Sequence, residues 1–436
     1  MFVNIIEKKV AFYTLGCKVN QYETDCMIEC LKQAGCEIVP YNTCADIYVI
    51  NTCAVTNMAE RKSRQIINRA KKVNPEAVVV AVGCYVQSEK QNLVQDLGID
   101  IIIGNNCKKN IATILNDYLD DKIVSDNLID INSTKEYEEM ILLKPSEHCR
   151  AYVKVQDGCN NFCSYCIIPY TRGRIRSREL KDVIAEVKEL AKRDIKEVVI
   201  TGINLSSYND SEDNSLLELL QSVSEIDGIM RIRMGSLEPR IISEEFLKGI
   251  SQNKKICPHF HLSLQSACNE TLKRMNRKYT IETYMEKCEL IRKYYDRPAI
   301  TTDVIVGFPG ETEEEFATTV ANLEKLKLYE MHIFKYSKRN GTIAAQMPAQ
   351  VDDSIKDKRS NILINMAKCH KEEFEQSFKG EDVSILVEEY VEKDETFFMK
   401  GHTDRYILLN ISAEKAVCKR NINSMITVKY NLKNKF

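Results

Sequence analysis

Short, continuously apolar runs alternate with amphipathic stretches through the first quarter of the chain. The runs are VAFYTLG (10–16), DIYVIN (46–51), AVVVAVG (77–83) and DIIIG (100–104), and stretches such as 57–73 and 87–97 between them have a helical period. Strands that are apolar on both faces are typical of parallel sheets covered by helices. The pattern therefore predicts a parallel α/β domain over residues 8–120.

The alternation stops and then resumes. Residues 121–144 lack a clear period and are interpreted as a linker. Over residues 145–370, strand-like segments from AYVKVQ (151–156) and EVVITG (197–202) to MHIFKYS (331–337) alternate with helical patterns. Six such strand–helix units without an obvious closing pair predict a partial (β/α)6 barrel.

The pattern of apolar and polar residues changes again near the carboxyl end. Residues 371–436 contain short strand-like runs, VSILVEEYV, TFFMKGH, RYILLN and SMITVKY, separated by polar turns. This spacing is typical of a small β-barrel of the OB-like kind. The whole chain is thus predicted to be an α/β protein with three domains, which fits its length of 436 residues.

The sequence contains 17 cysteines, and their interpretation depends on the cellular compartment that the rest of the sequence indicates. The first ten residues carry charges, and no stretch approaches the roughly 18 uncharged apolar residues of a membrane span. We therefore expect a cytoplasmic protein with no membrane partner. In that compartment thiols stay reduced, so dense cysteine indicates metal binding or catalysis more than disulfides.

Charge is balanced overall but concentrated locally. The net charge of −2 argues against indiscriminate coating of nucleic acid. Six basic residues and no acidic one lie between 61 and 72, and eight lie in the tail from 396 to 436 against two acidic ones. Four arginines alternate along RGRIRSR: Arg172, Arg174, Arg176 and Arg178. Separate basic patches favour a polyanion held at defined places, although single runs are often only solvated faces.

Three cysteines in DGCNNFCSYC (157–166) follow directly on the first barrel strand: Cys159, Cys163 and Cys166. This position is the first βα loop, at the end of the barrel where active sites are built. Three thiolates can hold three irons of a [4Fe–4S] cluster and leave the fourth iron open. A zinc loop is the alternative, but a fourth Cys or His at ordinary spacing is missing.

A second set of cysteines is far apart in sequence but shares one structural position. Cys17, Cys53 and Cys84 each come just after a predicted strand of the first sheet, in TLGC, INTC and AVGC. The carboxyl ends of parallel strands gather at one crevice, so these thiols are expected to meet there. Buried small hydrophobic residues are the alternative interpretation.

The motifs together resemble the radical S-adenosylmethionine (SAM) enzymes, and within them the methylthiotransferases. The resemblance runs from about Lys9 to the carboxyl end and is carried by TLGCKVNQYE (14–23), NTCAVTN (51–57), DGCNNFCSYCIIPYTRGRIRSR (157–178), SLEP (236–239), TDVIVGFPGET (302–312) and HIFKYSKRNGT (332–342). The tail is similar to the TRAM domain, an RNA-binding β-barrel.

The resemblance implies two [4Fe–4S] clusters and two uses of SAM. One SAM methylates sulfur held at the Cys17/Cys53/Cys84 cluster. Another is reduced at the Cys159/Cys163/Cys166 cluster and supplies a 5′-deoxyadenosyl radical. The implied partners are tRNA, an electron donor such as flavodoxin or ferredoxin, and a sulfur source. The four arginines of RGRIRSR are expected to contact the RNA.

SAM contacts are carried over from the family residue by residue. Tyr165, next to the last cysteine, is expected against the adenine, and Phe334 lies in the last barrel strand. The other expected contacts all fall at carboxyl ends of predicted barrel strands. They are Gly202, Asn204, Ser236, Glu238, Ser263, Gln265, Asp303 and Val306.

The family has branches with different substrates. GCKVNQYET and NTCAVTNMAERKSRQ look like the branch that adds a methylthio group to ring carbon 2 of threonylcarbamoyladenosine next to the tRNA anticodon. Methylthiolation of isopentenyladenosine in tRNA stays open as an alternative. So does a non-catalytic iron–sulfur protein that binds RNA or transfers electrons.

Overall fold

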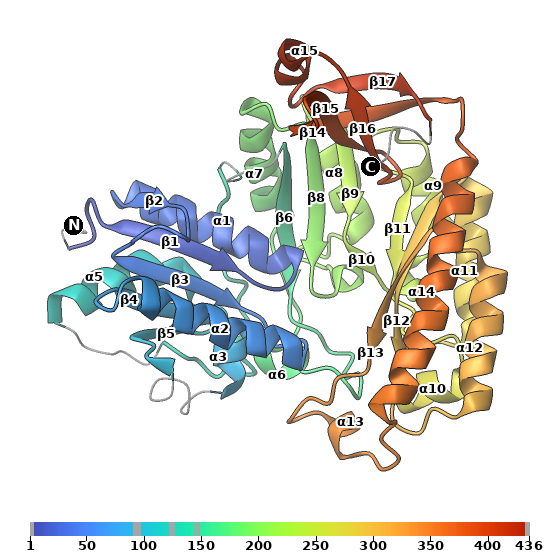
Figure 1. Cartoon of the computed structure of the whole chain (residues 1–436), viewed down its shortest axis with the longest axis horizontal. Coiled ribbons are helices and arrows are strands. Elements are labelled where there is room, and N and C mark those ends of the chain that lie inside the picture. Colours follow the sequence, from blue (N-terminus) through green and yellow to red (C-terminus); the bar gives the residue numbers. More distant parts are fainter. Residues whose placement is uncertain (1–3, 90–96, 122–126, 144, 146–148, 432–436) are drawn as a thin grey trace.

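The computed structural model describes residues 4–89, 97–121, 127–143, 145 and 149–431 (Figure 1). An N-terminal sheet with its helices lies beside a barrel-like central body, and a small antiparallel sheet covers one end of that body (Figure 1). The α/β class predicted from the apolar pattern is confirmed.

The N-terminal sheet is parallel throughout, in the order β2-β1-β3-β4-β5. The four predicted strands are β1 (Lys9–Thr14), β3 (Ile47–Thr52), β4 (Val78–Gly83) and β5 (Ile101–Ile103). The edge strand β2 (Glu37–Val39) was not predicted, because its three residues are too few for a periodic signal. The helices are α1 (Lys18–Gln33), α2 (Asn57–Val73), α3 (Cys84–Glu89) and α5 (Ile111–Asp121), preceded by η1 (Lys108–Asn110).

The predicted helix at 87–97 falls mostly on residues 90–96, outside the described residues. The helix α2 agrees closely with the prediction for 57–73, and Thr56 caps it by accepting a hydrogen bond from the Ala59 backbone N–H.

The central body contains six parallel strand–helix units in two sheets. One sheet has the order β7-β6-β8-β9 and the other β10-β11-β12-β13. Gly235 separates β9 from β10, so one strand region serves both sheets. The strands are β6 (Arg150–Asp157), β7 (Arg176–Ser177), β8 (Glu197–Gly202), β9 (Arg231–Met234), β10 (Ser236–Leu237), β11 (His259–Leu262), β12 (Ala299–Val306) and β13 (Glu330–Lys335). This architecture confirms the partial (β/α)6 barrel.

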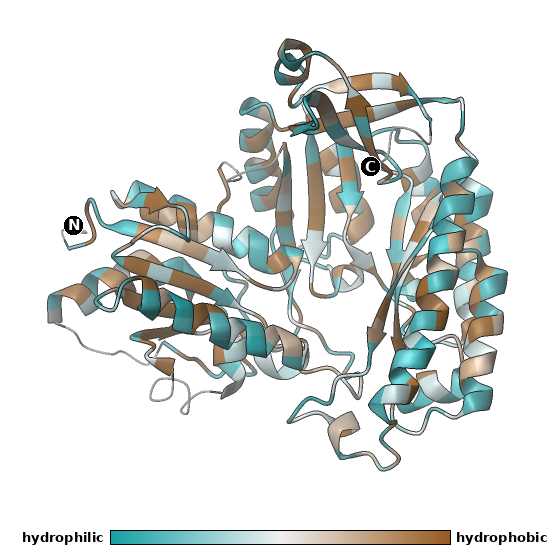
Figure 2. Cartoon of the chain, viewed as in Figure 1, coloured by the Kyte–Doolittle hydropathy of each residue, from teal (hydrophilic) through white to brown (hydrophobic). Residues whose placement is uncertain are grey.

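Helices cover the outside of these strands and keep their polar faces toward solvent (Figure 2). The helices are α6 (Ile168–Thr171), α7 (Leu180–Lys192), α8 (Leu216–Ser224), α9 (Glu244–Ser251), α10 (Asn269–Arg274), α11 (Ile281–Tyr294), α12 (Glu313–Leu326), α13 (Ile343–Gln346) and α14 (Asp353–Gln376). Capping boxes begin α8 at Ser215 and α12 at Thr312.

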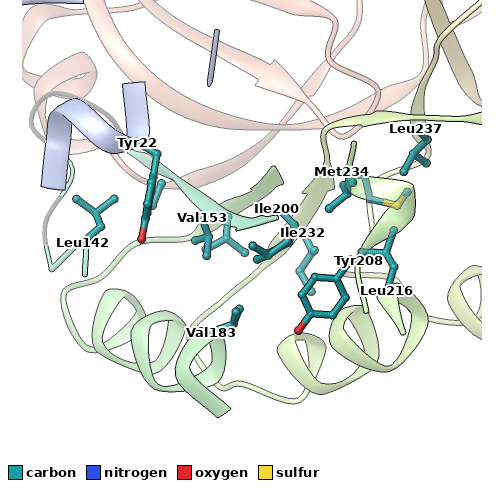
Figure 3. Packing of buried hydrophobic residues seen from close by; sticks show 14 of the residues in the cluster. Tyr22, Leu142, Val153, Val183, Ile200, Tyr208, Leu216, Ile232, Met234 and Leu237 are labelled. Carbon is teal, nitrogen blue, oxygen red and sulfur yellow. The ribbon is translucent and has the colours of Figure 1, made fainter. Parts of the chain in front are cut away.

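One buried apolar cluster extends from the central body into the N-terminal domain. Figure 3 shows Tyr22 of α1 and Leu142 beside Val153 of β6, with Ile200 and Ile232 farther along the same layer. Residues 127–143 form no helix and only an isolated bridge, yet Met140 and Leu142 are buried and the Met140 carbonyl accepts a hydrogen bond from Tyr22 Oη at 2.7 Å. The predicted linker is therefore packed, in its described part, between the two bodies.

The C-terminal sheet is antiparallel, in the order β16-β15-β14-β17. Its strands are β14 (Asp382–Lys393), β15 (Thr396–Thr403), β16 (Leu408–Ser412) and β17 (Met425–Lys429), with the helix α15 (Lys415–Arg420). The helix α14 is continuous through residues 370 and 371, so the domain boundary predicted there lies inside a helix. The small C-terminal β domain follows that helix.

This C-terminal sheet is anchored to the starting ends of the barrel strands (Figure 1). Arg231 and Arg233 of β9 donate to backbone carbonyls of His402 and Asp404 at 2.8 and 2.9 Å. Glu197, the first residue of β8, accepts from Arg233 at 3.1 Å. The domain therefore lies at the opposite end of the barrel from the cysteine-bearing loop after β6.

A buried network of charged side chains joins the N-terminal domain to the barrel. Six ion pairs link four cations to only two carboxylates, and every member has at most 4% of its side chain exposed. The cations are Lys108, Lys154, Arg172 and Arg176, and the carboxylates are Glu23 and Asp157. The network thus holds two positive charges that no carboxylate within it matches.

Glu23 is the centre of this network. Burial alone would raise the pKa of Glu23, but Arg172, Lys108 and Lys154 together hold it well below its ordinary value. Glu23 accepts from Lys154 and from Arg172 at 2.9 Å each, and it also pairs with Lys108. The carboxylate is therefore ionised and joins three elements of the chain.

Within the part of the chain that the structure describes, helices long and apolar enough to cross a membrane are absent.

Replacing Glu23 tests this interdomain network. We expect Glu23→Gln to destabilise the protein by about 3–5 kcal/mol, because removing one partner leaves buried cations uncompensated. Urea unfolding followed by circular dichroism under anaerobic conditions measures the change. Glu37→Gln, on the exposed edge strand β2, is the control and should stay within about 0.5 kcal/mol of the original protein. Equal urea midpoints for both variants would contradict the network.

Candidate active site

The first set of predicted cysteines gathers at one end of the N-terminal sheet. Cys17 follows β1, Cys53 follows β3 and Cys84 follows β4, and these three strands are neighbours in the sheet. Cys84 is close enough to act electrostatically on both Cys17 and Cys53, and Cys17 also acts on Cys53. Gly16 permits this approach: its φ is +106°, and a Cβ there would lie 3.1 Å from Cys53 Sγ.

The second set lies on the loop after β6, as predicted. Cys159, Cys163 and Cys166 interact electrostatically with one another. The Cys166 backbone N–H donates to the Cys163 carbonyl at 2.9 Å, and the Asn161 backbone N–H donates to Cys159 Sγ at 3.5 Å. The loop therefore folds back on itself so that its thiols face a common space.

The spacing in both sets is wider than a single metal ion requires. Sulfurs of a tetrahedral zinc site lie roughly 3.8 Å apart, because Zn–S bonds are about 2.3 Å long. In the described residues neither cysteine set brings three donor atoms within 4.8 Å of one another. A larger inorganic unit that spans three thiolates, such as an iron–sulfur cluster, fits this spacing better than one zinc ion.

Each cysteine set has one buried arginine that donates to a sulfur. Arg172 Nε lies 3.2 Å from Cys84 Sγ, and Arg277 Nη1 lies 3.2 Å from Cys163 Sγ. The amide of Asn105 adds a contact of 3.6 Å to Cys84. Hydrogen bonds to ligand sulfurs stabilise negative charge on them, so both surroundings favour thiolates.

One other thiol of each set is buried deeply enough to stay protonated when no cation is bound. Burial raises the pKa of Cys53 to about 12 and that of Cys166 to about 12. Metal ligands must be deprotonated, so loading either site releases protons. The cation-rich network behind Cys84 supplies the charge that such thiolates need.

A cavity of about 260 Å³ is lined by residues of both the N-terminal domain and the barrel. Val55 and Thr56 line it from the N-terminal domain, two and three residues after Cys53, and Tyr165 lines it from the barrel, one residue before Cys166. The other lining residues come from the barrel strands and the segments that follow them: Gln265, Asp303, Ile305, Phe334, Lys335, Tyr336 and Ser337. One space is thus bordered by neighbours of both cysteine sets.

Contacts between the two domains close this space on one side. The Asn57 backbone N–H donates to Ser337 Oγ at 3.2 Å. Arg339 donates to Asn57 Oδ1 at 2.9 Å and forms an ion pair with Glu60 of α2. These bonds hold the start of α2 beside the segment that follows β13.

The predicted SAM contacts fall into three groups. Tyr165, Gln265, Asp303 and Phe334 line the cavity. Three others lie beside the barrel cysteines: Asn204 is 3.8 Å from Cys159 Sγ, while Glu238 and the Ser263 carbonyl accept from Arg277 at 2.9 and 3.3 Å. Gly202 is the last residue of β8 as predicted, but Ser236 is the first residue of β10 and not at a carboxyl end. Val306 is buried in the apolar core, with its side chain outside the lining of the cavity.

The four arginines expected to contact RNA do not share one environment. Arg172, Arg176 and Arg178 are at most 3% exposed, and Arg178 pairs with Glu186 at 2.9 Å. Their guanidinium groups neutralise carboxylates inside the protein, so they are unavailable to RNA phosphates. Only Arg174 is exposed, and it lies over the Phe162 ring at 4.5 Å.

Sequence reasoning missed Arg277 and Glu23. Arg277 joins Cys163, Glu238 and Tyr279, but it stands in a helix–loop segment with no cysteine or strand pattern to mark it. Glu23 lies on α1, and its partner Arg172 is 149 residues away. A single sequence carries no signal for such pairs.

Comparisons with known families agree with this geometry. Residues 153–323 match the model of the radical SAM superfamily, and residues 9–104 match that of the uncharacterized protein family UPF0004. The second match covers the predicted N-terminal cysteine set.

Curated relatives match most of the chain. Threonylcarbamoyladenosine tRNA methylthiotransferase MtaB of Bacillus subtilis (strain 168) is 39% identical over 91% of this chain and 89% of its own length. The protein of the same name from Aquifex aeolicus (strain VF5) is 42% identical over 87% and 92%. The tRNA-2-methylthio-N(6)-dimethylallyladenosine synthase of Thermoanaerobacter pseudethanolicus is 38% identical over 87% and 82%.

Solved structures share the fold at low identity. The radical SAM methyltransferase TsrM from Kitasatospora setae, with cobalamin and a [4Fe–4S] cluster bound, has a TM-score of 0.55 and 15% identity, over 76% of this chain and 72% of that one. Because curated relatives reach 39–42% identity over most of its length, this chain belongs to the methylthiotransferase family of radical SAM proteins.

Proposed function

We propose that the protein is a radical SAM transferase that adds a methylthio group to ring carbon 2 of threonylcarbamoyladenosine in tRNA. The observation that carries this proposal is the single cavity bordered by neighbours of both cysteine sets. Relatives named for this activity reach 42% identity. Relatives named for dimethylallyladenosine reach 38%, so that substrate is the second candidate.

The barrel set, Cys159, Cys163 and Cys166, would hold one [4Fe–4S] cluster with an open iron. The N-terminal set, Cys17, Cys53 and Cys84, would hold the second. Three observations support this second cluster. Three strand ends converge at its cysteines, and the cysteine sulfurs are spaced more widely than a single metal ion requires. The positive charge beside Cys84 is also not matched by carboxylates of the network. A cluster held by three thiolates carries net negative charge and would offset part of that excess.

With clusters and SAM bound, the site would supply a 5′-deoxyadenosyl radical, as is typical of the superfamily. The chain's own residues do the positioning. Tyr165 and Phe334 both line the cavity and offer aromatic surface for an adenine, while Gln265 offers polar atoms for the ribose or the amino-acid part of SAM. Glu238, fixed by two hydrogen bonds from Arg277, offers a carboxylate beside the barrel cysteines.

A nucleic acid would approach over the mouth of the cavity. Val55 and Phe334 line the cavity with exposed apolar side chains, and Met58 is exposed in the first turn of α2. Arg61 and Lys62 are exposed on the same helix α2, whose first turn borders the cavity through Asn57. Exposed apolar groups beside cations are typical of surfaces that stack unpaired bases and hold their phosphates.

The proposed enzyme would also need partner molecules. Reduction would require an electron donor such as flavodoxin or ferredoxin, and repeated turnover a sulfur source. The C-terminal sheet would act as a TRAM-like RNA-binding domain, and the enzyme would work in the cytoplasm. Because that sheet is docked on the starting ends of the barrel strands, it would contact a part of the tRNA distant from the reacting base.

Substitutions in the two cysteine sets should separate two reactions. We expect Cys163→Ala to abolish release of 5′-deoxyadenosine from SAM by reduced, reconstituted protein. Cys84→Ala should retain that release and abolish methylthio transfer. Cys369→Ala, at an exposed cysteine on α14, is the control and should retain both. Chromatography of both products measures the outcome, and transfer by Cys84→Ala at the original rate would refute the second cluster.

The nucleosides of a deletion strain identify the substrate. We expect mass spectrometry of its tRNA to show threonylcarbamoyladenosine without the methylthio mark, and plasmid-borne protein to restore that mark. Loss of the mark on isopentenyladenosine instead would favour the second candidate. Retention of both marks would contradict a methylthiotransferase role.

Charge reversal tests the RNA-facing surface. We expect Arg61→Glu combined with Lys62→Glu to weaken tRNA binding at all salt concentrations and to lower the salt-dependence slope by about two, because each lost phosphate contact removes about one. The control is Lys181→Glu with Lys188→Glu, which makes the same charge change on the exposed face of α7. Equal slopes for both double variants, measured by filter binding, would rule out this surface.

A further inference from the structure

Three potential metal ligands that belong to neither cysteine set gather on adjacent barrel strands. His261 lies on β11, Asp303 on β12 and His332 on β13, and their donor atoms all lie within 4.8 Å of one another. Asp303 and His332 are directly opposite in the parallel register, and His261 is opposite Thr301. Among the described residues this is the one group of three or more such ligands that comes so close.

Thr301 fixes the orientation of the first imidazole. Its Oγ1 lies 2.9 Å from His261 Nδ1, which leaves His261 Nε2 facing Asp303 Oδ2 at 3.6 Å. A direct N–H···O bond is shorter, near 2.9 Å. Two ligand atoms bound to one ion through bonds of about 2.1 Å lie roughly 3.0–3.5 Å apart. Moreover, a metal-binding histidine usually uses its second nitrogen in such an orienting hydrogen bond.

The other two ligands have free donor atoms. In the described part of the chain, neither the Asp303 carboxylate nor the His332 ring takes part in a hydrogen bond. The His261 and His332 rings are nearly parallel, with centroids 6.0 Å apart and an angle of 26° between their planes. The His261 and Asp303 side chains are 15% and 33% exposed, and His332 is more open still, so small ions can enter.

We propose that His261, Asp303 and His332 bind a divalent transition-metal ion. Two imidazoles and one carboxylate form a donor set that suits Zn²⁺, Mn²⁺, Fe²⁺ or Co²⁺, whereas Mg²⁺ and Ca²⁺ prefer oxygen ligands alone. Three protein ligands leave further coordination positions open. The site is distinct from the cysteine sets in both its residues and its ligand chemistry.

The open positions would face the central cavity, because Asp303 lines it. They suit an oxygen ligand such as a carboxylate or hydroxyl of a bound substrate. The metal site itself rests only on the geometry above; its use in recognition rests on the proposed function. In that function the threonylcarbamoyl group offers both oxygen types and an isopentenyl group offers neither, so the ion would help to select the substrate.

Mn²⁺ is a suitable probe because it binds nitrogen and oxygen ligands in preference to the soft sulfur of cysteine thiolates. Cluster-loaded protein is titrated with MnCl₂ without tRNA, and loss of the six-line electron paramagnetic resonance signal of free Mn²⁺ reports binding. We expect saturable binding of one Mn²⁺ per chain. Asp303→Asn or His332→Ala should abolish it. Thr301→Val, which removes the orienting hydrogen bond but no ligand, should weaken it at least about tenfold.

Glu324→Gln is the matched control, because Glu324 pairs with His370 at 3.3 Å without a third ligand. This variant should bind Mn²⁺ like the original protein. Full retention of the free Mn²⁺ signal by the original protein, or equal binding by the Asp303 and His332 variants, would overturn the metal site. Since no tRNA is present, these outcomes are independent of whether methylthio transfer itself is observed.

Discussion

A buried network of ion pairs, in which cations outnumber carboxylates, holds the N-terminal domain against the barrel. Four cations share two carboxylates in a space almost closed to water, and one of them, Arg172, also donates to Cys84 Sγ at 3.2 Å. Buried charge without a counterion is costly. Glu138 lies close by and burial raises its pKa, but it forms no ion pair with these cations in the described structure. Anionic sulfur ligands at Cys84 and its neighbours would supply the missing charge.

This interface also determines the position of the cavity. The segment from Cys166 through α6 to Arg172 connects the barrel cysteines to the thiol of Cys84. The cavity is therefore built from two domains, with Val55 and Thr56 on one side and Tyr165 on the other. Chemistry that needs two cofactors to reach one substrate atom requires such an arrangement. The C-terminal sheet, docked at the far end of the barrel, leaves the mouth of the cavity open.

Local patterns predicted most of the fold and the positions of both cysteine sets, because a buried parallel strand has a clear apolar run and the cysteines lie on the segments that follow such strands. They failed where a residue's partner is distant in the chain. The alternating arginines of RGRIRSR are equally compatible with a solvent-facing strand and with buried counterions. Their partners Glu23 and Glu186 lie on other elements of the chain. Likewise, only the strand register brings His261, Asp303 and His332 together.

In the proposed enzyme, each cysteine set would hold its own iron–sulfur cluster. Iron analysis with Mössbauer spectroscopy of anaerobically reconstituted protein tests it most directly. The account predicts about eight irons per chain in two [4Fe–4S] clusters, and about four after Cys17, Cys53 and Cys84 are all replaced by alanine. Four irons in the original protein, or eight in that triple variant, would contradict it.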